Sequence, residues 1–386
     1  IMKNKIFSFL FVFFCVTVAF SQNKEKTKAP SSYQNTEFHT DYKPNYKNDG
    51  LNKPVKNVIL LIGDGMGLAQ ASAGMYANHN TLTIFNLKNI GLIKTFSLSD
   101  FITDSAASGT AYATGEKTKN GCIGVDSLGN KLPNMTEILS PLGYATGIVT
   151  TDKITGATPS AFYAHQIKRN MTKEILEDLV NTKALFIAGS SVKDFEKNNT
   201  EKLDALKKKN FKVLHDYKNL PLSMEAEKIA LICDDMNAKF ISEGRNPNYL
   251  KETTAQAIKF LSNKSKKGFF LMVEGAQIDW ASHNNVIENV IREVLDFDKA
   301  VEEALKFADK NGETLVIITA DHETGGMSLS NGNIEKGSIK AHFATSGHSP
   351  IMVPVYAYGP QAQLFRGVQD NTEIFSKILS ALQVKK

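Results

Sequence analysis

The sequence predicts an α/β fold in which two layers of helices enclose a largely parallel β-sheet. Short apolar runs of strand length recur along the chain, and longer segments with apolar residues at three- and four-residue spacing separate them. Parallel strands need such helical connections and are buried on both faces. We therefore expect a three-layer α/β/α sandwich, with its binding site beyond the carboxyl ends of the strands.

Seven apolar runs are the expected strands, and two segments have the clearest helical periodicity. The helices are expected over 251–261 and 286–308. No internal repeat or domain-scale linker interrupts the pattern, so residues 54–386 are expected to form one domain. The expected strands cover 58–62, 145–150, 185–187, 229–232, 269–273, 315–319 and 352–358.

The residues before this domain divide into two segments. Lys3 and Lys5 precede an apolar stretch, and Ala19 and Ser21 place small residues at positions −3 and −1 of a cleavage site. This pattern predicts a signal peptide over residues 1–21 and export to the periplasm or the medium. The stretch is too short for a comfortable membrane span, and no other segment approaches one. Residues 22–53 are polar and aperiodic, as expected of a flexible tail or an arm.

Composition and charge are those of an ordinary globular protein. Of the 386 residues, 42% are hydrophobic and 22% are charged, and the net charge is only +5. The lysines are scattered, so no nucleic-acid-specific binding is predicted. Export permits a disulfide between Cys122 and Cys233, but two buried free thiols explain them equally well. Cysteine metal ligands are not expected, because no C-x-x-C spacing occurs.

Acidic residues follow two of the expected strands. Asp64 lies in a Gly-Asp-Gly segment after the first strand, where a plain turn is the simpler interpretation. Glu274 closes the fifth run, and Asp279 and His283 follow at a four-residue spacing that places both on one helix face. Isolated Asp/His pairs are usually surface residues. A carboxylate that ends an apolar strand, however, needs a partner.

Two further motifs place histidines at the same edge of the predicted sheet. Asp321 and His322 follow the run 315–319, and His348 precedes the last expected strand. Asp and neutral His are ligands that zinc accepts. Each motif alone is weak, but four at one sheet edge indicate a metal centre.

Ser105 begins an Ala-rich segment that predicts a helix N-terminus. An Asp or Ser at this position can simply cap the helix. Alternatively, the free N–H groups and the helix dipole favour an alkoxide and a phosphate group there. The four metal-ligand motifs favour the second interpretation.

Together the five motifs resemble those of the alkaline phosphatase family of the two-zinc type. The resemblance covers residues 55–360 and rests on Asp-Ser-Ala-Ala-Ser, Glu-Gly-x-x-Ile-Asp-x-x-x-His and Thr-Ala-Asp-His. It implies an alkaline phosphatase-like fold and hydrolysis of small-molecule phosphate monoesters, with two zinc ions and one magnesium ion per chain. It also implies a homodimer. Ser105 resembles the nucleophile that forms a phosphoserine intermediate.

The resemblance also assigns the other site residues. Arg169 resembles the phosphate-binding arginine, and Asp104 would hold it in place. His348 rather than His342 is the expected ligand, because its ten-residue gap to Tyr358 fits the family. The implied metal ligands are Asp279, His283 and His348 for the first zinc, Asp64, Asp321 and His322 for the second, and Thr158 and Glu274 for magnesium, toward which Asp64 would bridge.

Two positions depart from the family pattern. Gly156 stands where some members carry Asp or His, and Trp280 stands where others carry Lys or His. Groups that hydrogen-bond the waters of magnesium strengthen its binding, so we expect a weakly held ion unless Glu323 or another neighbour fills the gap at Gly156. Only residues 323–347 occupy the place where larger relatives insert a crown domain, which makes this a compact version.

Two other classes of function are the alternatives. A sulfatase of the same superfamily would need a C/S-x-P-x-R motif, which is absent, and a diesterase would gain little from a magnesium site and an arginine at the third phosphate oxygen. A secreted metal- or phosphate-binding protein would have no use for Ser105 among zinc ligands. A phosphate monoesterase uses all of these residues.

Overall fold

A ten-stranded sheet forms the centre of the molecule in the computed structural model, which describes residues 29–196, 199–234 and 238–385. Its strand order is β15-β3-β14-β9-β2-β8-β4-β5-β7-β6. β14 is antiparallel to its neighbours β9 and β3, and every other neighbouring pair is parallel. The strands span Asn57–Gly63 (β2), Asn89–Lys94 (β3), Ala145–Lys153 (β4), Phe186–Ser190 (β5), Phe211–Leu214 (β6), Lys228–Cys233 (β7), Phe269–Gly275 (β8), Thr314–Thr319 (β9), Val353–Tyr358 (β14) and Gly367–Asp370 (β15).

The predicted α/β fold with a largely parallel sheet is confirmed, and all seven expected strands are present. The central strands are buried along their whole length, as in β2 and β8, which explains their continuous apolar sequence. Three strands of this ten-stranded sheet were not expected, namely β3, β6 and β15. They lie toward the two edges of the sheet, where half-exposed strands mix polar with apolar residues.

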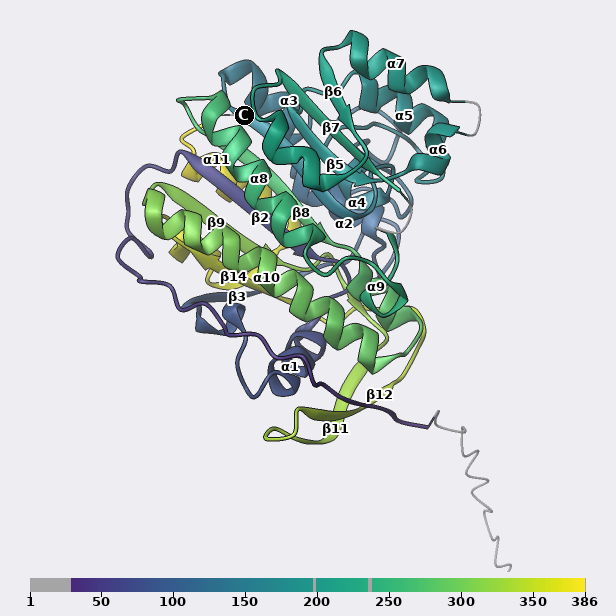
Figure 1. Cartoon of the computed structure of the whole chain (residues 1–386), viewed down its shortest axis with the longest axis vertical. Coiled ribbons are helices and arrows are strands. Elements are labelled where there is room, and N and C mark those ends of the chain that lie inside the picture. The colour runs from purple at the N-terminus through teal and green to yellow at the C-terminus, as the bar shows by residue number, and fades with distance from the viewer. Residues whose placement is uncertain (1–28, 197–198, 235–237, 386) are drawn as a thin grey trace, which may run out of the picture.

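Helices cover both faces of this sheet. Adjacent residues of β8 point to opposite faces: Phe269 contacts Phe307, and Phe270 stacks on Phe162. α8 and α10, the two helices expected from periodicity, pack together across the near face in Figure 1, whereas α2 and α11 pack on the other side. The helices are Leu68–Ala77 (α1), Ser105–Thr114 (α2), Met135–Leu139 (α3), Ala157–Ser160 (α4), Thr172–Val180 (α5), Val192–Glu196 (α6), Thr200–Lys208 (α7), Tyr249–Lys264 (α8), Gln277–His283 (α9), Ile287–Asn311 (α10) and Asn371–Ala381 (α11).

A small second sheet projects from the body at the bottom of Figure 1. The hairpin of β11 (Met327–Asn333) and β12 (Ser338–Phe343) forms it together with β1 (Ser31–Gln34), which pairs antiparallel with β12. The compact 323–347 segment therefore contributes a hairpin that pairs with the chain's N-terminal part.

The segment between β1 and β2 lies along the body and is held by hydrogen bonds. The Tyr42 hydroxyl donates to Asp309 Oδ2 at 2.6 Å, and the Tyr46 hydroxyl donates to the Asn86 carbonyl at 2.6 Å.

The predicted signal peptide, residues 1–21, lies outside the described residues. Cys122 and Cys233 are both free thiols. Within the described part of the chain, none of the helices combines the length and apolar character that crossing a bilayer requires.

The topology brings the candidate site residues to one edge of the sheet. β2 lies between β8 and β9 in parallel register, with Ile62 paired to both Glu274 and Thr319. Because β14 runs antiparallel, its start lies at the edge where the parallel strands end. The two-residue strands β10 (Glu323–Thr324) and β13 (His348–Ser349) pair at this edge and hold their loops together.

Candidate active site

One group of three predicted ligands converges at the end of α9. Asp279 Oδ2 lies 3.2 Å from His283 Nε2, and His348 Nε2 lies 3.2 Å from the same nitrogen. The other ring nitrogens face carbonyl groups, His283 Nδ1 that of Ser346 at 2.5 Å and His348 Nδ1 that of Thr103 at 2.9 Å. A carbonyl oxygen can only accept, so each Nδ1 carries the proton. Two Nε2 lone pairs and a carboxylate then face one point, which is the arrangement of a zinc site.

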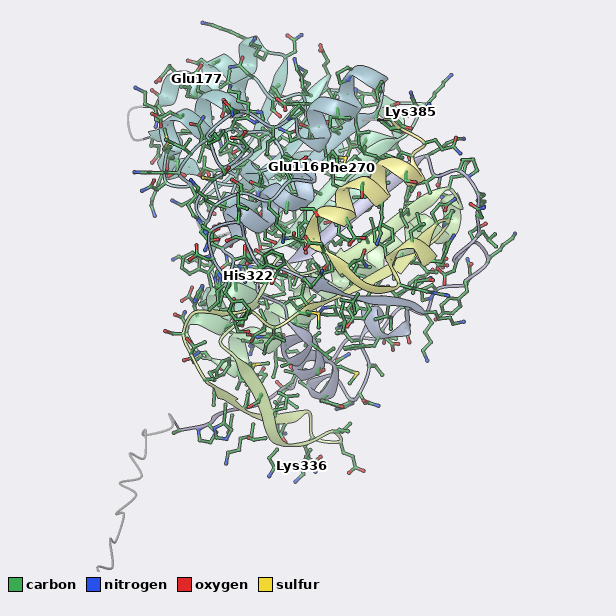
Figure 2. The ribbon with its side chains drawn as sticks, turned by 180° about the vertical axis from the view of Figure 1, so that it is seen from behind. Glu116, Glu177, Phe270, His322, Lys336 and Lys385 are labelled. Carbon is green, nitrogen blue, oxygen red and sulfur yellow. The ribbon has the colours of Figure 1, made fainter. Side chains whose placement is uncertain are left out.

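A second group surrounds His322, which is fully buried. Its Nε2 atom lies 3.1 Å from Asp321 Oδ2, 3.5 Å from Asp64 Oδ1 and 3.3 Å from Ser105 Oγ. The other oxygen of Asp321 accepts the backbone N–H of Gly65 at 3.0 Å. Asp64 Oδ1 and Asp321 Oδ2 are buried and receive no hydrogen bond of ordinary geometry among the described residues. In Figure 2, His322 lies where the body meets the β11–β12 hairpin.

Thr324 links the two groups, and sequence reasoning missed it. Its hydroxyl donates a short hydrogen bond to Asp279 Oδ1 and lies 3.2 Å from His322 Nδ1. A hydroxyl has one proton, so toward His322 the threonine oxygen accepts, and Nδ1 carries the hydrogen. The Nε2 lone pair of His322 then faces two carboxylate oxygens, an arrangement that a cation satisfies.

The charges within these groups also favour a cation. Burial, together with Asp321 and Asp279, raises the pKa of Asp64 well above its usual value. Burial would lower the pKa of His322, but Asp321 raises it, so the pocket favours a positive charge. The donor set of Asp and His fits zinc.

Ser105 is the first residue of α2, as predicted, but Asp104 caps the helix. Asp104 Oδ1 accepts the backbone N–H of Ala107 at 3.0 Å, so capping leaves the Ser105 hydroxyl free to face His322. Asp104 Oδ2 lies 3.1 Å from Arg169 Nη1 and also accepts the N–H of Gly121 at 3.0 Å. The structure therefore places Arg169 against Asp104, as expected.

A third group contains only oxygen donors. The Thr150 hydroxyl donates a short hydrogen bond to Glu274 Oε2. The Thr158 hydroxyl lies close enough to lower the pKa of Glu274, yet this buried oxygen makes no hydrogen bond of ordinary geometry in the described chain. Burial and the charge of Asp152 nevertheless raise the pKa of Glu274 to about 8. Carboxylate and hydroxyl oxygens of this kind fit magnesium.

Asp152 is the second residue that sequence reasoning missed. It lies near the end of β4, just as Glu274 lies near the end of β8, so a search for a carboxylate at every strand end would have found it. Its carboxylate occupies the space beside Gly156. Glu323, which the sequence offered as one candidate for that gap, instead accepts hydrogen bonds from Gln70 and Ser349, because its loop turns toward α1 and β13. The side chain beside Gly156 is therefore that of another neighbour, Asp152, the second option that the sequence left open.

Two further predicted features lie at the margin of the site. His342 is a β12 residue of the small sheet, opposite Ser328, and belongs to neither candidate metal group of the described residues. Trp280 is half-exposed, with its ring 6.1 Å from that of His283. It lies beside the first group and contributes no charge to it.

Comparison with known proteins gives consistent results. The sequence model of the family described as alkaline phosphatase matches residues 55–194 and 196–343. Alkaline phosphatase 3 of Bacillus subtilis is 32% identical, with 87% of this chain and 91% of that protein covered. The Escherichia coli alkaline phosphatase is 31% identical, covering 86% and 87% of the two chains.

Solved structures show the same relationship. The alkaline phosphatase of the Antarctic bacterium TAB5 is 40% identical, with a TM-score of 0.82, and covers 86% of this chain and 100% of that chain. A variant of the TAB5 enzyme, solved with magnesium bound in its M3 site, has a TM-score of 0.80 at 40% identity, over 87% and 100% of the two chains.

Proposed function

The chain belongs to the alkaline phosphatase family of enzymes, and on this basis we propose that it hydrolyses phosphate monoesters through a phosphoserine formed on Ser105. The observation that carries the proposal is the position of Ser105. Its Oγ atom lies at the start of α2, 3.3 Å from His322 Nε2, where the carboxylates of the second group converge. A nucleophile at a helix N-terminus among metal ligands suits attack on a phosphoryl group.

The three groups of donors would hold two zinc ions and one magnesium ion. When bound, these cations supply Lewis-acid stabilisation of the charges on the phosphoryl and ester oxygens. The proposed ligands are Asp279, His283 and His348 for one zinc, Asp64, Asp321 and His322 for the other, and Asp64, Thr158 and Glu274 for magnesium.

The protein groups position the substrate and carry the bond changes. The guanidinium of Arg169, held by Asp104, would bind two non-bridging oxygens in a bidentate manner. Ser105 Oγ attacks phosphorus, the ester P–O bond breaks, and the alcohol leaves with a proton. Water then attacks the phosphoserine, the P–Oγ bond breaks, and inorganic phosphate leaves while the serine hydroxyl is regenerated.

The wider setting of the enzyme follows from its sequence and family. We propose that residues 1–21 direct export to the periplasm or the medium, and that residues 54–386 form the catalytic domain. A homodimer is proposed on the family resemblance alone.

The test compares a chromogenic phosphate monoester with its diester, each with and without a chelator. The monoester should be hydrolysed much faster, and chelation should stop the reaction. Acid quenching during turnover of labelled substrate should trap phosphate on Ser105, detected by peptide mass spectrometry. Equal rates on both substrates would instead assign the chain to the diesterase branch. Label on another residue would exclude Ser105 as the nucleophile.

A further inference from the structure

The absence of a side chain at Gly156 is explained by the space around this position and not by its backbone conformation. Gly156 has φ −58° and ψ 159°, angles that any residue adopts. A Cβ atom at this position would lie 2.6 Å from Asp152 Oδ2 and 3.3 Å from its Cγ. The carboxylate of Asp152 therefore occupies the volume that a side chain at position 156 would otherwise enter.

Hydrogen bonds tie Asp152 to the oxygen-donor group. Its backbone N–H donates to Thr150 Oγ1 at 2.8 Å, and the hydroxyl of Thr150 donates to Glu274 Oε2. One threonine thus contacts both the Glu274 carboxylate and the backbone of Asp152. The two carboxylates are close enough that Asp152 is the largest influence on the pKa of Glu274 after burial.

Two positive charges, those of Lys153 and Arg169, act on the Asp152 carboxylate, but each cation also pairs with another carboxylate. Lys153 pairs with Asp194 at 3.2 Å, and Arg169 pairs with Asp104 at 3.1 Å. Beside Glu274, the buried Thr158 hydroxyl makes no hydrogen bond of ordinary geometry in the described chain. Two neighbouring carboxylates and a free hydroxyl form an environment that a hydrated divalent cation satisfies.

From this arrangement we infer that Asp152 holds the waters of the magnesium ion, in place of a side chain at position 156. The inference rests on the proposed function, because it concerns the proposed magnesium site. Magnesium keeps several waters in near-octahedral order, and a carboxylate that accepts their hydrogen bonds strengthens its binding. The site is then complete although Gly156 contributes no side chain.

Magnesium titration into zinc-loaded protein, followed by calorimetry, tests the inference. Asp152→Asn should weaken magnesium binding by about tenfold or more, the range found when groups that support metal sites are removed. Asp194→Asn is the matched control, because it removes the same charge from the other side of the same loop, where it contacts Lys153 and Thr155. This control should leave magnesium affinity within about twofold of wild type, a change below ~0.5 kcal/mol.

A carboxylate exchange provides a second, independent measurement. Asp152→Gly combined with Gly156→Asp should restore most of the magnesium affinity that Asp152→Asn removes. The 2.6 Å contact disappears with the Asp152 side chain, whereas the Lys153 carbonyl oxygen, 2.9 Å from the new Cβ, must move to admit it, so recovery is expected to be incomplete. Zinc content measured by mass spectrometry shows whether each variant retains its folded site.

Two results would overturn the inference. One is unchanged magnesium affinity in Asp152→Asn. The other is a loss of phosphate affinity with magnesium binding intact, which would mean that Asp152 orients Arg169. Failure of the proposed function would give a different result from failure of this inference. In that case the wild-type protein would lack monoesterase activity but could still bind magnesium in an Asp152-dependent way.

Discussion

The proposed metal centre has two halves of similar construction and different chemistry. In the histidine half (Asp279, His283, His322 and His348), the Thr324 hydroxyl donates to Asp279. In the carboxylate half (Asp152, Thr158 and Glu274), the Thr150 hydroxyl donates to Glu274 in the same way. Each half thus has a buried carboxylate fixed by a threonine, but only one half contains imidazoles.

This difference is visible in the pKa values of the carboxylates in the two halves. Burial alone would raise the pKa of Asp279, but the His283 hydrogen bond and the charge of His322 lower it to about 2. Burial and Asp152 raise the pKa of Glu274 to about 8, although the threonine hydrogen bond opposes this. The histidine half therefore keeps an ionised carboxylate without a metal. The carboxylate half needs a cation or a proton, and its oxygen-only donors select the harder ion.

Metal removal should produce the largest effect and separate the halves most clearly. Exhaustive chelation should reduce monoesterase activity to the background rate, because both halves lose their cations. Zinc alone should restore most of the activity, and magnesium alone should restore none, since Ser105, the proposed nucleophile, faces the histidine half. Full recovery with magnesium alone would show that the carboxylate half, and not the histidine half, carries the reaction.

Ser105→Ala should lower turnover by about three orders of magnitude or more, as removal of other catalytic nucleophiles does. The change removes one buried oxygen next to His322 and no metal ligand. Zinc and magnesium content and the thermal midpoint should therefore match wild type. Loss of zinc from this variant would mean that Ser105 supports metal binding in the histidine half and does not act only as the nucleophile.

The two threonines form a matched pair that tests whether the halves are independent. Thr324→Val should weaken zinc binding by about 10- to 100-fold, and Thr150→Val should weaken magnesium binding by a similar factor, because each removes the hydrogen bond that orients a carboxylate. Competition with metal-binding dyes measures both affinities. The serine variants should restore them. If either valine variant affected both metals equally, the halves would behave as one unit.

Arg169→Ala should have the smallest effect, about a tenfold rise in the inhibition constant of inorganic phosphate, because one charge-assisted hydrogen-bonding group is lost. Arg169 lies outside both halves and pairs with Asp104. The content of both metals should not change. Lys168→Ala, which removes a neighbouring exposed charge, is the control and should leave phosphate inhibition unaltered.

The core architecture, and the edge of the sheet at which the proposed metal ligands gather, follow from the pattern of residues in the sequence, whereas the assignment of individual ligands came from the family resemblance. A strand in the middle of a parallel sheet is buried on both faces, so its sequence must be continuously apolar, as in β2 and β9. Parallel strands end at one edge, so the pattern of runs and acidic residues is enough to predict that Asp64, Glu274 and Asp321 meet there. The start of α2 at Ser105 is equally predictable, because helix capping is a local interaction.

Other features depend on contacts between distant or non-periodic segments, and these follow only from the three-dimensional fold. β3, β6 and β15 lie toward the sheet edges. Their sequences mix polar and apolar residues, and they form strands because an adjacent strand is there to pair with. The meeting of β1 with the β11–β12 hairpin joins segments about 300 residues apart, which no local pattern encodes. The directions of the Thr324 hydroxyl and the Asp152 carboxylate are set in the same way. A side chain's direction depends on what the fold packs beside it, so the gap at Gly156 and the carboxylate that fills it could be matched only in three dimensions.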